Sequence, residues 1–181
     1  MAAENIQEKE LKDKEKKNTP RAKQIPENTM IKVKSTVFGT LVYKAKRSGD
    51  ITVWDEQGDI QYMSLRDLIA MRNDAITFFK NQWVIVVGVD ESETCKASVC
   101  DIYSAIGVSM YYKNVIDPTD YQAVCSWSII EIPEKVAQLS PAGKENFIVA
   151  LNKFISDGTL DSRKKIKAFE KALGCDLVEE D

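Results

Sequence analysis

Residues 30–89 constrain the fold of this chain most, because they fit several short strands and one helix into sixty residues. Apolar and polar side chains alternate with a period of two over residues 31–37, which is typical of a half-buried strand. Four further strands are predicted, separated by turn sequences, at 40–46, 51–54, 60–63 and 83–87. We expect the first two strands to form a hairpin through Phe38-Gly39. This order predicts a small SH3-like β-barrel, with an open half-barrel as the alternative.

A capped helix interrupts the strands. Ser64 stands three residues before Asp67, so its hydroxyl can accept a backbone N–H while the carboxylate favours the positive end of the helix. Leu65 and Leu68 begin an apolar stripe on the same helix. The sequence therefore predicts a helix that starts directly after Ser64.

Helical patterns dominate the second half. Apolar residues recur at helical spacing from Cys95 to Ile106, and Gly107 can end that helix. Helix starts are indicated at Asp117-Pro118 and at Ser140-Pro141, and a last helix is predicted over 162–173 with Gly174 after it. We therefore expect an α+β chain in three parts. They are an extended, charged N-terminal arm at 1–29, a β-barrel-like domain with short helices at 30–112, and a compact helical subdomain at 113–181.

The N-terminal arm is too polar to form a core. Residues 1–27 hold seven Lys or Arg and six Asp or Glu, with one Leu and two Ile. Such a segment cannot bury enough apolar surface to offset the entropy lost on ordering. It is either a solvated tail or an arm that becomes ordered against a neighbouring subunit.

Several kinds of chemistry are disfavoured by composition. The chain has no histidine, which removes Ser-His-Asp and Cys-His catalysis and histidine-ligated metals. The four cysteines form no C-x-x-C pair, so we expect free thiols, and neither glycine-rich phosphate-binding motif occurs. Acidic turns at 55–59 and 90–93 lack the ligand order of a calcium loop. We expect no cofactor, no metal and no enzymatic activity, although a hydrolase that uses carboxylates distant in sequence stays open.

Two sets of residues are candidates for binding. Basic residues of the expected hairpin can share one face as a positive patch for phosphate backbones or acidic proteins, or they are ordinary solubilising lysines: Lys32, Lys34, Lys44, Lys46 and Arg47. Most aromatic residues, Trp54 among them, are expected in the core. An exposed aromatic pair would instead anchor a protein interface, and the candidates are Phe78, Phe79, Trp83, Tyr111 and Tyr112.

A resemblance adds to this interpretation. The runs at 53–63 and 78–83, with Leu65 and Leu68 between them, resemble a pattern in uncharacterised structural proteins of tailed bacteriophages. The resemblance covers about residues 31–110 and implies a virion component of the neck, tail, baseplate or capsid surface, present in repeated copies. No functional residue carries over with it.

These observations lead to one expected function and one alternative. The first is a non-enzymatic structural or adaptor protein of a phage particle, assembled in the host cytoplasm, whose partners are other virion proteins and copies of itself. The alternative is a nucleic-acid-binding regulator that uses the lysine-rich hairpin. No apolar run reaches the roughly 20 residues that a membrane span needs, so no membrane partner is expected.

Overall fold

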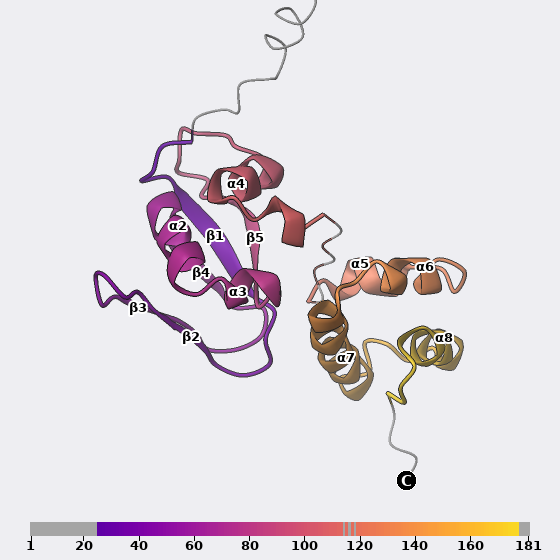
Figure 1. Cartoon of the computed structure of the whole chain (residues 1–181). Helices are drawn as coiled ribbons and strands as arrows, with labels where there is room; N and C mark the ends of the chain where they lie inside the picture. The colour runs from indigo at the N-terminus through magenta and orange to yellow at the C-terminus, as the bar shows by residue number, and fades with distance from the viewer. Residues whose placement is uncertain (1–24, 114, 116, 118, 178–181) are drawn as a thin grey trace, which may run out of the picture.

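The computed structural model describes residues 25–177 except 114, 116 and 118, so the expected arm at 1–29 lies mostly outside the described residues. The chain is a mixed α+β protein with a small antiparallel sheet, a separate two-stranded ribbon and several helices (Figure 1). In chain order the elements are β1 (Met30–Ser35), β2 (Leu41–Lys44), β3 (Ile51–Trp54), β4 (Ile60–Ser64), α2 (Leu65–Asp74), α3 (Thr77–Lys80), β5 (Val84–Val89), α4 (Val99–Ile106), the 3-10 helix η1 (Ser109–Tyr111), α5 (Tyr121–Ser126), α6 (Ile132–Ala137), α7 (Pro141–Ser156) and α8 (Arg163–Leu173).

The pairing of the strands differs from the expected hairpin. β1 is the central strand of a sheet in the order β4-β1-β5, and β2 pairs only with β3. The prediction of a hairpin between β1 and β2 is therefore wrong, and so is the prediction of a closed barrel. Period-two alternation shows which side chains share a face but does not identify the partner strand. The SH3-like details of the β module stay a prediction.

A buried tryptophan ties the ribbon to the sheet. Trp54, at the end of β3, is fully buried, as expected, and its indole N–H donates to the Val33 carbonyl of β1 at 2.9 Å. Leu41 lies opposite Trp54 in the ribbon and is buried with it, while Ile31 and Val33 face the same core from β1. This core fixes the inner face of the ribbon against the sheet.

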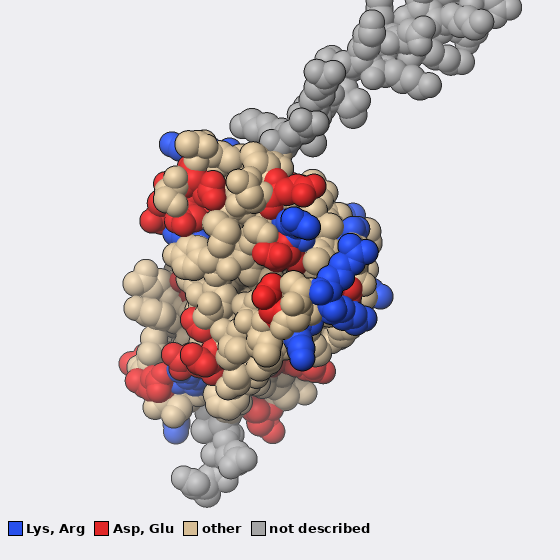
Figure 2. All heavy atoms as spheres, turned by 90° about the vertical axis from the view of Figure 1, so that its left-hand side faces the viewer, with Lys and Arg blue, Asp and Glu red and all other residues tan. Residues whose placement is uncertain are grey.

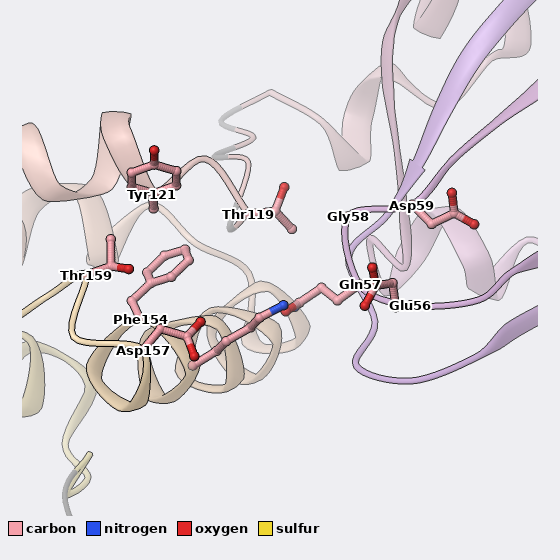
Figure 3. A pocket seen from close by; sticks show the side chains of 10 residues that line it. Glu56, Gln57, Gly58, Asp59, Thr119, Tyr121, Phe154, Asp157 and Thr159 are labelled. Carbon is pink, nitrogen blue, oxygen red and sulfur yellow. The ribbon is translucent and has the colours of Figure 1, made fainter.

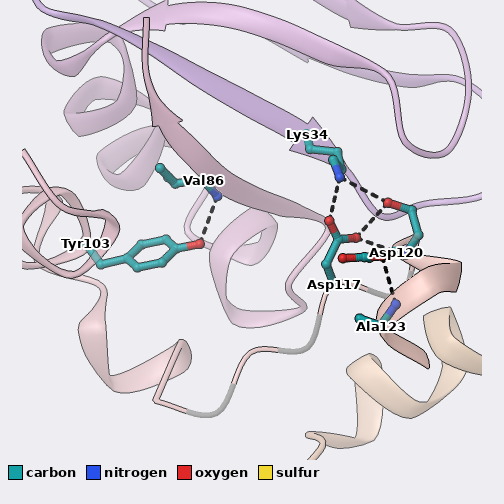
Figure 4. Close-up of polar contacts among 7 residues, drawn as sticks. Lys34, Val86, Tyr103, Asp117, Asp120 and Ala123 are labelled. Carbon is teal, nitrogen blue, oxygen red and sulfur yellow. Dashed lines mark hydrogen bonds and ion pairs between the residues drawn. The ribbon is translucent and has the colours of Figure 1, made fainter. Parts of the chain in front are cut away.

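Two tyrosines cover the free edge of β5. The Tyr103 hydroxyl accepts the Val86 N–H at 2.8 Å (Figure 4). The Tyr112 hydroxyl donates to the Val84 carbonyl at 2.6 Å. Their rings stack with centroids 4.1 Å apart. Backbone groups that an edge strand would otherwise expose are thereby satisfied by side chains from α4 and from the segment after η1.

The helical half has its own core. Its buried side chains form a cluster separate from that of the sheet, around Trp127, Phe147 and Phe169. The signals at Ser64, Gly107, Ser140 and Gly174 are all confirmed as helix caps. The helix expected from Asp117-Pro118 instead begins at Tyr121, because the Asp120 side chain accepts the Ala123 N–H. The two cores agree with a division near residue 113, but the exact domain bounds stay a prediction.

We expect the Tyr103→Phe substitution to destabilise the fold by about 1–3 kcal/mol, because it leaves the Val86 N–H buried without a partner. Denaturant unfolding checks this value. Tyr62→Phe is the matched control, since the Tyr62 side chain is 51% exposed, and it should leave the midpoint unchanged. Equal effects of the two substitutions would contradict the role given to Tyr103.

Stability should also fall at alkaline pH. Burial raises the pKa of Tyr103 and of Tyr112, so both phenols stay neutral in the folded protein when those of the unfolded chain ionise near pH 10. Ionisation then favours the unfolded state, and the free energy of unfolding should decrease as pH rises above about 10. Measured by denaturant unfolding between pH 8 and about 11, the decrease should be shallower in Tyr103→Phe. An identical pH profile would argue against this linkage.

Candidate protein-interaction surfaces

Only some of the candidate aromatic anchors are accessible. Phe79 and Tyr112 are 1% and 7% exposed and belong to the sheet core, so their assignment to an interface is wrong. Phe78, Trp83 and Tyr111 are half-buried. Phe78 contacts Trp83 edge to face, with ring centroids 5.4 Å apart. The aromatic residues of this region thus pack mainly against one another.

The five candidate basic residues do not form one hairpin face. Lys32 and Lys34 lie on β1, whereas Lys44, Lys46 and Arg47 lie in or next to β2, which does not pair with β1. The Lys32 ammonium lies 2.5 Å from the Glu91 carboxylate, whose hydrogen bond raises the pKa of that lysine. Lys34 is also paired, as described next. The structure therefore disperses the expected patch.

A polar joint connects β1 to the segment that leads into the helical half. The Lys34 ammonium donates to the Asp117 carboxylate at 2.5 Å and to the Thr119 hydroxyl at 3.2 Å (Figure 4). Asp117 also accepts the backbone N–H and the hydroxyl of Thr119, at 2.9 and 2.6 Å. The side chains of Lys34 and Asp117 are 17% and 26% exposed, so partial burial strengthens this interaction.

Gln82 forms a second joint between the halves. It lies between α3 and β5 with a φ of 52°, a conformation uncommon for a residue other than glycine. Its side-chain amide donates to the Tyr111 carbonyl at 2.6 Å, and its amide oxygen accepts the Ser140 hydroxyl, the cap of α7, at 3.2 Å. Thr36 donates to the Gln82 carbonyl at 2.5 Å and accepts the Asn146 amide of α7 at 3.2 Å.

A cavity of about 480 Å³ lies between the halves. Gln57 and Gly58 border it from the turn between β3 and β4, and Tyr121 and Phe154 from the helical side (Figure 3). Its charged lining is mixed, with Lys153 among three carboxylates. Within the described residues no group of three or more cysteine and carboxylate side chains could hold a metal ion. The four cysteines are free thiols, in agreement with the sequence interpretation.

The outer face of the ribbon carries three accessible apolar side chains beside the exposed Lys44, an apolar group that the sequence does not reveal. Val42 and Val53 lie directly opposite each other and are 52% and 36% exposed, and Ile51 is 60% exposed. Because side chains alternate between the two faces of a strand, these residues lie on the other face of the ribbon from Tyr43, whose side chain is buried. We call Val42, Ile51 and Val53 the outer ribbon face.

A groove of about 1130 Å³ lies on the inner side of the ribbon, between it, β4 and α2. Tyr43 and Thr52 border it from the ribbon, and Tyr62 from β4. The groove is lined by four acidic and two basic side chains: Glu27, Asp50, Asp67, Asp74, Arg47 and Arg66. Figure 2 views the molecule from the side on which the ribbon and α2 lie, where acidic and basic side chains are interspersed with uncharged surface. We call this cavity the ribbon groove.

The comparisons leave the resemblance to phage proteins untested. No family model, no curated protein and no solved structure matches the chain. No helix in the described part of the chain is both long and apolar enough to span a membrane. The interaction surfaces described above are therefore the observations on which a functional proposal depends.

We expect Asp117→Ala to weaken the joint between the halves. The substitution removes the partner of a largely buried ammonium and should cost about 1–2 kcal/mol of stability. It should also speed limited proteolysis near residue 117, followed by mass spectrometry of the fragments. Glu91→Ala is the control, because the Glu91 side chain is 89% exposed whereas that of Asp117 is 26% exposed, so loss of its pair with Lys32 should change neither measurement. Equal proteolysis of the two variants would show that Asp117 does not hold this segment.

Proposed function

We propose that this chain is a non-enzymatic structural or adaptor component of a phage particle, located in the neck, tail, baseplate or capsid surface. It acts through protein–protein contacts of its N-terminal arm and of an open, half-barrel-like β module. The outer ribbon face carries this proposal. The membership of a phage particle rests on the sequence resemblance alone.

The ribbon has the features expected of a contact surface. A two-stranded ribbon has little stability by itself, and this one is held by burial of its inner face and by the hydrogen bonds that Trp54 and the Lys46 N–H donate to Val33 and Asp74. Its outer face presents the side chains of Val42, Ile51 and Val53 to solvent, where polar residues usually stand. An apolar patch framed by polar residues is typical of a protein interaction site. If the outer ribbon face is buried against a neighbouring subunit, both faces of the ribbon are shielded from solvent.

Nucleic-acid binding stays an alternative with less support. Lysine and arginine side chains bind a phosphate backbone by neutralising its charge, which releases the counterions of the nucleic acid. Lys32 and Lys34 already have carboxylate partners within the chain. The remaining basic group is Lys44, at the end of β2, with Lys46 and Arg47 in the turn that follows it. Binding to DNA at low salt that is lost on reversal of these three charges would favour the alternative.

Substitution of the outer ribbon face tests the contact directly. Val42→Lys combined with Val53→Glu keeps a favourable cross-strand pair, so the fold should be retained with an unchanged thermal midpoint. The pair should prevent incorporation into particles, because burial of two charges in an apolar interface is costly. A Val42→Ile, Val53→Ile variant is the control and should be incorporated normally. Normal incorporation of the charged variant would remove the outer ribbon face from the proposal.

The particle assignment has its own test. Phage particles purified from the host by density gradient should contain this chain in a fixed ratio to the other structural proteins, as measured by quantitative mass spectrometry. Its presence only in the soluble lysate, with none in washed particles, would contradict the proposed function.

A further inference from the structure

The ribbon groove is bordered by an edge strand with unpaired backbone. β4 is an edge of the sheet and pairs with β1 on one side only. At one end of β4 the Asp59 carbonyl accepts the Ser35 N–H, and at the other end the Leu65 N–H donates to the Thr29 carbonyl. These backbone groups therefore point towards β1. Because backbone groups alternate in direction along an antiparallel strand, those of Tyr62 point away from β1, and Tyr62 is one of the residues that line the groove. An extended segment placed in the groove can therefore add to the edge of β4.

The groove also contains a buried hydroxyl without a partner. The Tyr43 side chain is 4% exposed, and its hydroxyl makes no hydrogen bond within the described part of the chain. A buried polar group that lacks a partner costs free energy, so a ligand that supplies a donor or an acceptor here is favoured. Burial raises the pKa of Tyr43, and the carboxylates of Asp74 and Asp67 raise it further, which places negative charge close to this hydroxyl. The groove thus favours a cationic ligand that can form hydrogen bonds.

One segment of the chain itself has the matching chemistry. Residues 16–24 contain four basic residues, Lys16, Lys17, Arg21 and Lys23, and no Asp or Glu. The groove lining carries four acidic and two basic side chains, so its net negative charge is complementary to the positive charge of this segment. Pro20 restricts its own backbone and that of Thr19 to conformations that favour an extended segment.

We propose that residues 16–24 of a second copy of this chain bind in the ribbon groove, add to the edge of β4 and so join the two copies. This inference rests on the proposed function, because it names the partner of the arm. A second copy is favoured over the same chain because Ile25 is anchored in the sheet core and Pro26 begins a turn to Thr29.

Charge reversal on each side, with mixing of the variants, tests the pairing in the full chain. The arm variant carries K16E, K17E, R21E and K23E, and the groove variant carries Glu27→Lys and Asp50→Lys at two exposed positions of the lining. Light scattering coupled to size exclusion and sedimentation equilibrium measure self-association at low salt. The unmodified chain should associate, and each variant alone should associate about tenfold more weakly. An equimolar mixture should recover association, because the unmodified arm of the groove variant can bind the unmodified groove of the arm variant, and the two reversed surfaces are complementary as well.

The control variant is Glu145→Lys with Asp161→Lys, which changes charge equally at exposed positions outside the groove and should associate like the unmodified chain. Circular dichroism of each variant verifies that it is folded. An unmodified chain that stays monomeric, which is also the result if the segment occupies its own groove, would overturn the inference. So would association that both reversals leave unchanged, or that the mixture fails to recover. The particle test is independent: a chain found in particles without this pairing would retain the proposed function and lose only the inference.

Discussion

The position of β1 between two strands determines most of this structure. Its backbone is hydrogen-bonded to β4 on one side and to β5 on the other, so neither edge is left for β2. The chain after β1 must therefore leave the sheet and form a separate ribbon with β3, which is held against the sheet by its inner face and by the hydrogen bond from Trp54 to Val33. Both the outer ribbon face and the ribbon groove exist because this ribbon stands apart from the sheet.

The two halves are connected by polar contacts more than by a shared core. The apolar clusters around Trp54 and around Phe147 are separate, and the joints at Lys34 and Gln82 bridge them with hydrogen bonds. Hydrogen bonds and a partly buried ion pair fix orientation with less net stability than an apolar interface of similar extent. A small change of angle between the halves would therefore expose neither core.

Local features of the sequence predicted the elements well and their partners poorly. Alternation and turn residues located all five strands, and Ser64, Ser140 and Gly174 marked helix ends, because these signals act within a few residues. The hairpin failed because alternation is satisfied equally by any partner strand. Sequence composition does not distinguish a core aromatic residue from an exposed interface anchor, which is why the prediction for Phe79 and Tyr112 is wrong. The ribbon groove involves residues from 27 to 74, and its unpartnered hydroxyl becomes visible only in three dimensions.

Because Tyr103 and Tyr112 cover the edge of β5, only the β4 edge of the sheet can accept a further strand. With Tyr103 and Tyr112 bonded to Val86 and Val84, a fourth strand cannot dock beside β5 without displacing two buried phenols. Stacking of many copies edge on edge, as in a fibril, requires two open sides on every sheet. A sheet with one closed side accepts an added strand only along β4, so edge-to-edge stacking cannot propagate through it.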